Sequence, residues 1–329
     1  MFLSIGMLKL NYFLADIFIL SAEKQPIKLS WRKIECLLSN LYVIGNDRIN
    51  EDNLLIKLIL HSIGGLGVPI FVFISGWFGL NFRKERVLEL ITICIFYALL
   101  SSVLLSIFYG INRPKDVIFF LNNWWFIAAY LCIYCLSPGI NYLFSQTGKW
   151  NMLLCILIFL YISYGNQFHP GAQIGGLYQM FTMYFSARWI KLYGNKILIK
   201  YWWIILLICC FIRFGSIFIG YYTQHLGILP FINSYTCPIT IILSSSIFVA
   251  FKKIQFQSRI INKVAICAFS VYLFSEGQFG QIFFEPLFLH CGNINIAGYI
   301  CSSIFVYIFI TLIDQIRQFL MIKLVHKKL

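Results

Sequence analysis

The residues best suited to bind a charged ligand follow an apolar stretch that a Ser-Gly pair interrupts. Ser75 and Gly76 break this run, which ends in a basic segment with Arg83 and Arg86 one helical turn apart. Two guanidinium groups at this spacing can clamp a phosphate-bearing cofactor. A Ser-Gly pair lets another group approach a helix closely, and in lipid that group is commonly a second helix. An ordinary basic loop beside a membrane would also contain Arg83 and Arg86.

Three ionisable side chains in or beside apolar segments are candidates for a general base. Such a group inside a membrane helix costs about 2.5–3.5 kcal/mol on insertion scales, so each is a functional hypothesis by default. Glu276 lies well inside an apolar stretch, Asp16 follows Lys9 by two helical turns, and His61 stands at the start of the Ser-Gly segment. The structural alternatives are a polar packing contact for Glu276, a wrongly assigned helix for Asp16 and an interfacial histidine for His61.

The composition indicates a polytopic membrane protein. Hydrophobic residues make up 60% of the 329 positions and charged residues 12%. One crossing of the bilayer takes roughly 20 apolar residues, so the length allows about ten crossings and leaves little for soluble domains. We therefore expect an all-α integral membrane bundle that forms a single domain over residues 1–329. The net charge of +14 lies in short clusters between apolar segments, which favours the positive-inside rule over nucleic-acid binding.

Apolar runs and loop charges give an expected topology. Helices are predicted near residues 2–21, 58–80, 87–109, 117–137, 151–165, 174–190, 201–221, 230–251, 263–284 and 296–320. Every second loop is basic, which predicts that both termini are cytoplasmic. The segment 22–57 is the exception, because the topology places it outside despite its positive charges. The 11 cysteines show no metal-like spacing, so no metal site is expected.

Five groups of residues in chain order are similar to the signatures of one family. They are Val68, Pro69 and Phe71 with Ser75, Gly76, Arg83 and Arg86; Asn122 to Phe126 with Tyr130, Tyr134, Leu136, Ser137 and Pro138; Gly175 and Gly176 with Phe181, Tyr184 and Arg188; Ser270 to Leu273; and Asp314 to Arg317. Together they resemble the acyltransferase-3 family, which modifies surface glycans such as capsule or O-antigen from within the membrane. Each motif alone is a weak signal, and the ordered set is fairly specific.

The resemblance implies transfer of an acyl group, usually acetyl, from cytoplasmic acyl-CoA to a sugar hydroxyl of a lipid-linked or exported glycan. Acyl-CoA would be a co-substrate held by Arg83 and Arg86 beside Ser75 and Gly76, and no permanently bound cofactor is expected. The partners would be membrane lipid and a surface glycan, and the location a bacterial cytoplasmic (inner) membrane. The residues expected to line the glycan path are Trp124, Trp125, Tyr130 and Ser275.

The chain departs from the family where the base is expected. Family members usually supply a histidine eleven residues after an Arg or Lys in the first helix, but here the position after Lys9 is Leu20. A second histidine is replaced by Ser275, while the adjacent carboxylate, Glu276, remains. Two other functions therefore stay open. The first is a non-catalytic glycan export partner, and the second is a glycan polymerase, for which a larger outer loop with paired basic residues would be expected.

Overall fold

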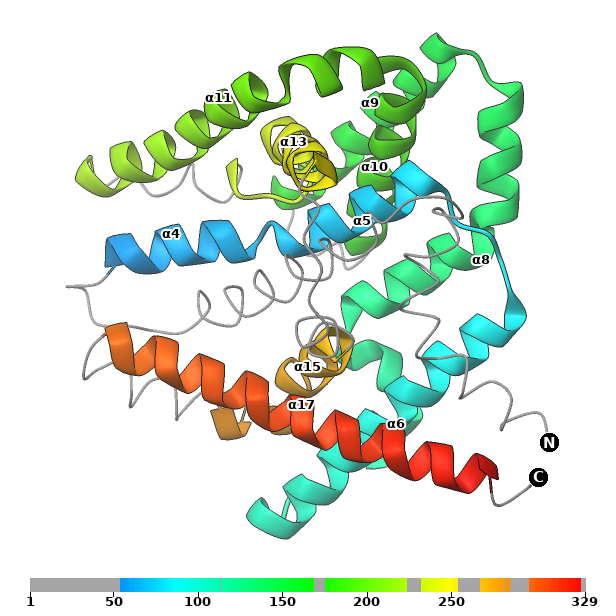
Figure 1. Cartoon of the computed structure of the whole chain (residues 1–329), viewed down its shortest axis with the longest axis vertical. Helices are drawn as coiled ribbons and strands as arrows, with labels where there is room; N and C mark the ends of the chain where they lie inside the picture. Colours follow the sequence, from blue (N-terminus) through cyan, green and yellow to red (C-terminus); the bar gives the residue numbers. More distant parts are fainter. Residues whose placement is uncertain are drawn as a thin grey trace. The chain divides into compact units, whose positions relative to one another are not determined.

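The computed structural model describes residues 54–112, 114–168, 175–223, 232–253, 267–280, 282–284 and 296–326, which form helices and contain no strand. The helices are α4 (Leu54–Gly64), α5 (Gly67–Phe78), α6 (Lys84–Tyr109), α7 (Pro114–Ile118), η3 (Phe120–Asn123), α8 (Trp125–Gln146), α9 (Lys149–Phe168), α10 (Gly175–Trp189), η4 (Ile190–Gly194), α11 (Asn195–Tyr222), α13 (Pro238–Lys253), α15 (Ala268–Ser275) and α17 (Ile296–His326). Figure 1 labels the longer helices and colours the chain from blue at the N-terminus to red at the C-terminus.

The helices gather in two compact units that alternate along the chain. Unit 1 comprises residues 1–52, 83–128 and 257–329, and unit 2 comprises 53–82 and 129–256. Three helices within the described ranges, over Lys84–Tyr109, Trp125–Gln146 and Lys196–Tyr222, are long and apolar enough to cross a membrane. An all-helical membrane protein is thus confirmed. The ten crossings, the sides of the termini and the single domain stay predictions.

Two helices predicted as continuous are interrupted in the structure. The run at 58–80 divides into α4 and α5, with a turn at Gly65 and Leu66. Glycine weakens the interior of a helix. Pro69 lacks the N–H that an unbroken helix would use for a hydrogen bond, but proline is tolerated in the first turn of a helix such as α5. The run at 117–137 likewise divides into α7, η3 and α8.

The helix predicted over 263–284 is also too long, because α15 ends at Ser275. Two glycines follow it closely. A Cβ at Gly277 would lie 2.9 Å from the carbonyl oxygen of Leu273, and a Cβ at Gly280 would collide with that of Phe274. The backbone folds back too tightly here for a side chain at either position.

Unit 2 is organised around α5, which packs against α10 and α13 (Figure 1). A Cβ at Gly76 would lie 2.6 Å from the backbone oxygen of Tyr184 and 2.7 Å from the Cβ of Ala187. These distances leave no room for a side chain, so the glycine is what allows α5 and α10 to touch. The structure therefore supports the helix-packing interpretation of Gly76.

The segment after α5 is fixed by three hydrogen bonds inside unit 2. The Leu80 N–H donates to the Tyr184 hydroxyl at 3.1 Å, and the Leu80 carbonyl accepts from Asn141 Nδ2 at 2.7 Å. The carbonyl of Asn81 accepts from the Tyr134 hydroxyl at 2.9 Å. Side chains from α8 and α10 thus satisfy backbone groups of the two residues that follow the end of α5 and its cap.

Arg213 ties α11 to α4 and α13 at another point of unit 2. Its guanidinium is fully buried and donates to the Ser62 hydroxyl at 2.7 Å, the Ser62 carbonyl at 2.9 Å and the Thr240 hydroxyl at 2.6 Å. Several neutral oxygens therefore accept hydrogen bonds from one buried positive charge. A buried guanidinium needs such bonds to replace its lost contacts with water.

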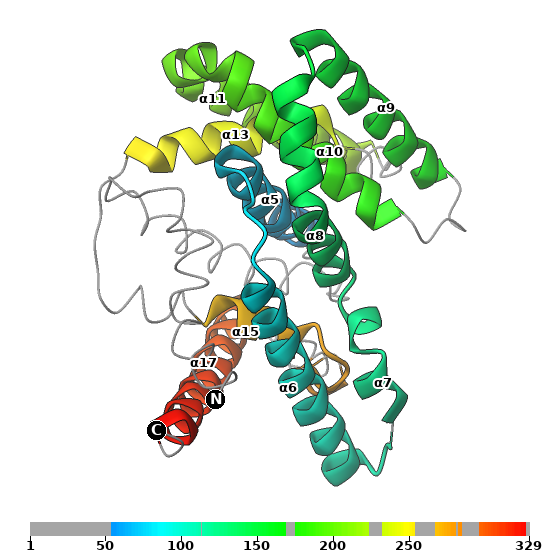
Figure 2. The ribbon, with the colours of Figure 1, turned by 90° about the vertical axis from the view of Figure 1, so that its right-hand side faces the viewer.

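Unit 1 contains α6, α7, η3, α15 and α17, with α15 packed against both α6 and α17 (Figure 2). A buried carboxylate joins three of these helices. Asp314 Oδ1 accepts hydrogen bonds of 2.7 Å from the Tyr97 hydroxyl, the Ser270 hydroxyl and Arg317 Nε. Asp314 Oδ2 accepts from Gln318 Nε2 at 2.6 Å. Both oxygens are engaged, so this carboxylate is a structural link between α6, α15 and α17.

We expect the Gly76→Ala variant to be less stable by about 1–3 kcal/mol, because the added methyl would force α5 and α10 apart. The measurement is the thermal unfolding midpoint in detergent. Gly215→Ala is the matched control, since nothing lies within 4 Å of a Cβ at Gly215 in α11. Equal midpoints for the two variants would show that the close contact of α5 with α10 contributes nothing.

Candidate functional site

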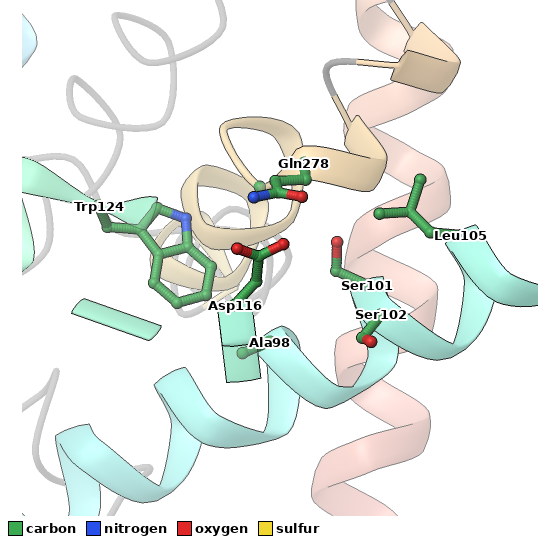
Figure 3. A pocket seen from close by; sticks show the side chains of 8 residues that line it. Ala98, Ser101, Ser102, Leu105, Asp116, Trp124 and Gln278 are labelled. Atoms are coloured by element: carbon green, nitrogen blue, oxygen red, sulfur yellow. The ribbon is translucent and has the colours of Figure 1, made fainter. Parts of the chain in front are cut away.

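A small cavity in unit 1 brings polar side chains together from α6, α7 and the turn after α15. Its lining residues are Ala98, Ser101, Ser102, Leu105, Asp116, Trp124, Gly277 and Gln278. Figure 3 shows the carboxylate of Asp116 between the indole of Trp124 and the hydroxyl of Ser101, with the amide of Gln278 beside it. A carboxylate, a hydroxyl and an amide therefore face the same space.

Hydrogen bonds and one glycine hold the walls of this cavity in place. The indole N–H of Trp124 donates to the Leu273 carbonyl at 3.0 Å, which joins η3 to α15. The Phe279 N–H donates to the Ser101 hydroxyl oxygen at 3.0 Å. Because this bond uses only a lone pair of Ser101, its hydroxyl can still donate. Gly277 lets the turn after α15 pass close to both Leu273 and Ser101.

The size of the cavity limits what it can hold. The volume open to the centre of a water molecule is about 10 Å³, which is about the space that one water needs. A sugar ring does not fit in it. The chemistry that suits such a space is acceptance of a proton by Asp116, either directly at the cavity mouth or through one water.

The three candidate bases from the sequence fall in different parts of the chain: one belongs to unit 1, one to unit 2, and one lies outside the described residues. Glu276 is half-buried and caps the C-terminus of α15, one residue before the cavity lining begins at Gly277. His61 belongs to α4 of unit 2, with its side chain outside what the structure describes. Asp16 lies outside the described residues. The catalytic role of each stays a prediction.

The residues expected to bind the acceptor lie in different surroundings. Trp124 lines the cavity, while Trp125 is 40% exposed and packs edge-on against Phe126. Tyr130 is buried in unit 2, where its ring meets that of Phe71 at 5.1 Å. Ser275 uses its hydroxyl within its own helix, donating to the Val271 carbonyl at 2.7 Å. Of the four, Trp124 alone lines this cavity.

The two arginines of the basic segment lie at the N-terminus of α6. Arg83 is the exposed N-cap residue and makes no side-chain cap, and Arg86 is 8% exposed. The first N–H groups of a helix lack partners within the helix and carry partial positive charge, which favours an anion there. Glu85 adds one negative charge to the same turn. The segment combines two guanidinium groups with a helix end.

Ser75 and Gly76 have separate roles in the structure. Gly76 packs against α10, whereas Ser75 is 4% exposed and its hydroxyl has no hydrogen-bond partner among the described residues. A buried hydroxyl without a partner is unusual and calls for an explanation such as a water or a ligand. The assignment of Ser75 to cofactor binding stays a prediction.

Helix α6 links the arginine pair to the cavity. Arg86 and Ser101 are fifteen residues apart on this one helix, which corresponds to about 22 Å at 1.5 Å per residue. A ligand with an anionic head at the helix N-terminus therefore needs a long arm to reach the cavity.

Asp116 is the residue that the sequence interpretation missed. It stands at the end of the Asn-Arg-Pro-Lys-Asp run, which reads as an ordinary outer loop. One signal was available, because no Asp or Glu occurs between Asp116 and Glu276. Asp116 is therefore the last carboxylate before a long stretch without one, and it comes shortly before the aromatic pair Trp124 and Trp125. This position made it a candidate base.

The comparisons with known proteins give one match. A family model described as an acyltransferase domain matches residues 38–314. No curated protein and no solved structure gives a match. No group of three or more His, Cys, Asp or Glu side chains with the geometry of a metal site occurs among the described residues.

Proposed function

Because the chain belongs to the acyltransferase-3 family, we propose that it transfers an acetyl or other acyl group from acyl-CoA to a hydroxyl of a lipid-linked or exported surface polysaccharide. The observation that carries the proposal is the family match over residues 38–314. It is supported by the placement of two arginines at the N-terminus of α6 and of a cavity with a carboxylate farther along the same helix.

In this proposal the donor phosphates bind at the N-terminus of α6. Arg83 offers an exposed guanidinium for paired hydrogen bonds, the largely buried Arg86 adds a second positive charge, and the helix end adds backbone N–H donors. The arm of coenzyme A then extends along α6 and brings the thioester toward the cavity. The basic loops, including the one with Arg83, lie on the cytoplasmic side of a bacterial inner membrane. Acyl-CoA is made in the cytoplasm, so the donor can reach them.

Asp116 acts as the acceptor-activating base in this proposal. Its carboxylate takes the proton of the sugar hydroxyl, directly or through the water that the cavity can hold. The hydroxyl oxygen bonds to the thioester carbon, the carbon–sulfur bond breaks, and the proton passes to the departing sulfur. The Ser101 hydroxyl and the Gln278 amide can donate to the developing oxyanion.

The arginine pair provides the test of this function. We expect the Arg83→Ala/Arg86→Ala variant to lose most ester on the surface glycan, since each lost charge-assisted bond to phosphate weakens binding roughly tenfold or more. The measurement is acetate released by mild base from the glycan, with the amount of exported glycan determined in parallel. Lys196→Ala/Lys200→Ala removes the same charge elsewhere and should retain the ester.

The missing first-helix histidine favours one alternative, a non-catalytic glycan export partner. That alternative predicts normal ester content per sugar and reduced export in the Arg83→Ala/Arg86→Ala variant. Such a result would contradict donor binding at Arg83 and Arg86 and would favour the export partner.

A further inference from the structure

Two cationic side chains of unit 2 converge on the end of α5. The guanidinium of Arg188, from the last turn of α10, lies against Gly79, where a Cβ would be 2.8 Å from Nη1. Lys252, near the end of α13, places its amine 6.0 Å from the ring centre of Trp77. Gly79 has a φ of +83°, so a side chain here would be strained as well as obstructed. The two cations therefore approach one helix end.

A third cation, Lys191 in η4, shares this region. Burial lowers the pKa of its amine, and the charges of Arg188 and Lys252 lower it further. Lys191 follows Arg188 by three residues, about one turn, where α10 continues directly into η4. The three cations therefore form one cluster. We call Arg188, Lys191 and Lys252 the basic cluster.

The basic cluster has no carboxylate partner within its own unit. Residues 53–82 and 129–256, which make up unit 2, contain no Asp or Glu. The buried Nε of Arg188 has no hydrogen-bond partner among the described residues. Adjacent like charges repel, and partial burial removes the water that would otherwise screen them. An anion from outside the unit would relieve both costs.

The C-terminus of α5 explains only part of this arrangement. The end of a helix carries about half of one negative charge, which attracts cations to its last turn. Arg188 and Lys252 bring two positive charges to this end, and Lys191 adds a third beside them. The remaining positive charge is far larger than the dipole can balance, and it calls for a ligand of at least one full negative charge.

We propose that Arg188, Lys191 and Lys252 form a binding site for a phosphate group. A guanidinium with two ammonium groups is the donor set that phosphate oxygens favour, with Arg188 able to bind in a bidentate manner. The phosphate can come from a soluble coenzyme A donor, in which case the site rests on the proposed function, or from the headgroup of an anionic phospholipid. The lipid source is independent of acyl transfer.

The test uses the full-length protein in nanodiscs and two probes. The first arm measures the Kd of coenzyme A in discs of phosphatidylcholine alone. The second arm measures retention of phosphatidylglycerol by native mass spectrometry after extraction from mixed discs. The variant is Arg188→Gln/Lys191→Gln/Lys252→Gln, and Lys149→Gln/Lys196→Gln/Lys200→Gln is the control with the same change in charge.

We expect the cluster variant to weaken one of the two probes by at least about tenfold, with the control within about twofold of the wild type. A change in the coenzyme A arm assigns the phosphate to the donor, and a change confined to the lipid arm assigns it to the headgroup. If neither probe distinguishes the cluster variant from the control, the proposal is wrong. Loss of glycan ester in Arg83→Ala/Arg86→Ala is a separate readout, so the proposed function can fail while the phosphate site stands.

Discussion

Replacing Asp116 with Asn should lower the acyl-transfer rate by about 10²–10⁴-fold, which is the usual contribution of a positioned general base. The substitution keeps the size of the side chain and removes its ability to take a proton. Asp116 lines the cavity together with Ser101 and Gln278, so its carboxylate lies among groups that can assist the transfer. The measurement is the single-turnover rate with saturating acyl-CoA, which separates the chemical step from donor binding.

Glu276→Gln is the matched comparison, because Glu276 is one of the candidate bases from the sequence and lies one residue from the cavity lining. We expect a much smaller loss for Glu276→Gln than for Asp116→Asn. Unfolding midpoints of both variants should stay close to that of the wild type. A large loss for Glu276→Gln with a normal rate for Asp116→Asn would move the base to Glu276.

Replacing Asp314 with Ala should destabilise the protein by about 3–5 kcal/mol, the range found when one partner of a buried ion pair is removed. Asp314 pairs with Arg317 at 2.7 Å and also accepts from Tyr97, Ser270 and Gln318. The variant leaves a buried guanidinium without its counterion and three donors without their acceptor. The measurement is the unfolding midpoint in detergent together with the yield of folded protein.

Thr311→Val tests the same helix one turn earlier. Thr311 is buried, and its hydroxyl has no hydrogen-bond partner among the described residues. Exchanging this hydroxyl for a methyl group should be neutral or slightly stabilising, since an unsatisfied polar atom is removed. If Asp314→Ala were as mild as Thr311→Val, the carboxylate would not join α6, α15 and α17 in the manner described.

The apolar composition was enough to predict a membrane protein. The ordered motifs were enough to predict its family. The close contact at Gly76 could also be anticipated, since a small residue within a large-residue run has few other uses in lipid. The division into α4 and α5 had a local signal in Gly64, Gly65, Gly67 and Pro69. Hydropathy averaged over a window conceals such a break.

The cavity could not be predicted, because its walls come from distant parts of the chain. Ser101, Asp116, Trp124 and Gln278 meet only after α7 and η3 fold beside α6 and the turn follows α15. The search for bases in or beside apolar segments found Glu276 and passed over Asp116, which lies in an expected loop. Gln278 reaches the cavity because α15 ends at Ser275 and a tight turn with Gly277 and Gly280 follows.

The most direct test of the central claim is acyl transfer by the purified protein from isotope-labelled acetyl-CoA to the lipid-linked glycan of its own host. The account predicts base-labile label on the glycan with the wild type, and little or none with Arg83→Ala/Arg86→Ala or with Asp116→Asn. Label that reaches the glycan equally with all three proteins would contradict the assigned residues. A folded wild type that moves no label to glycan or water, yet restores glycan export in cells, would contradict the acyltransferase function itself.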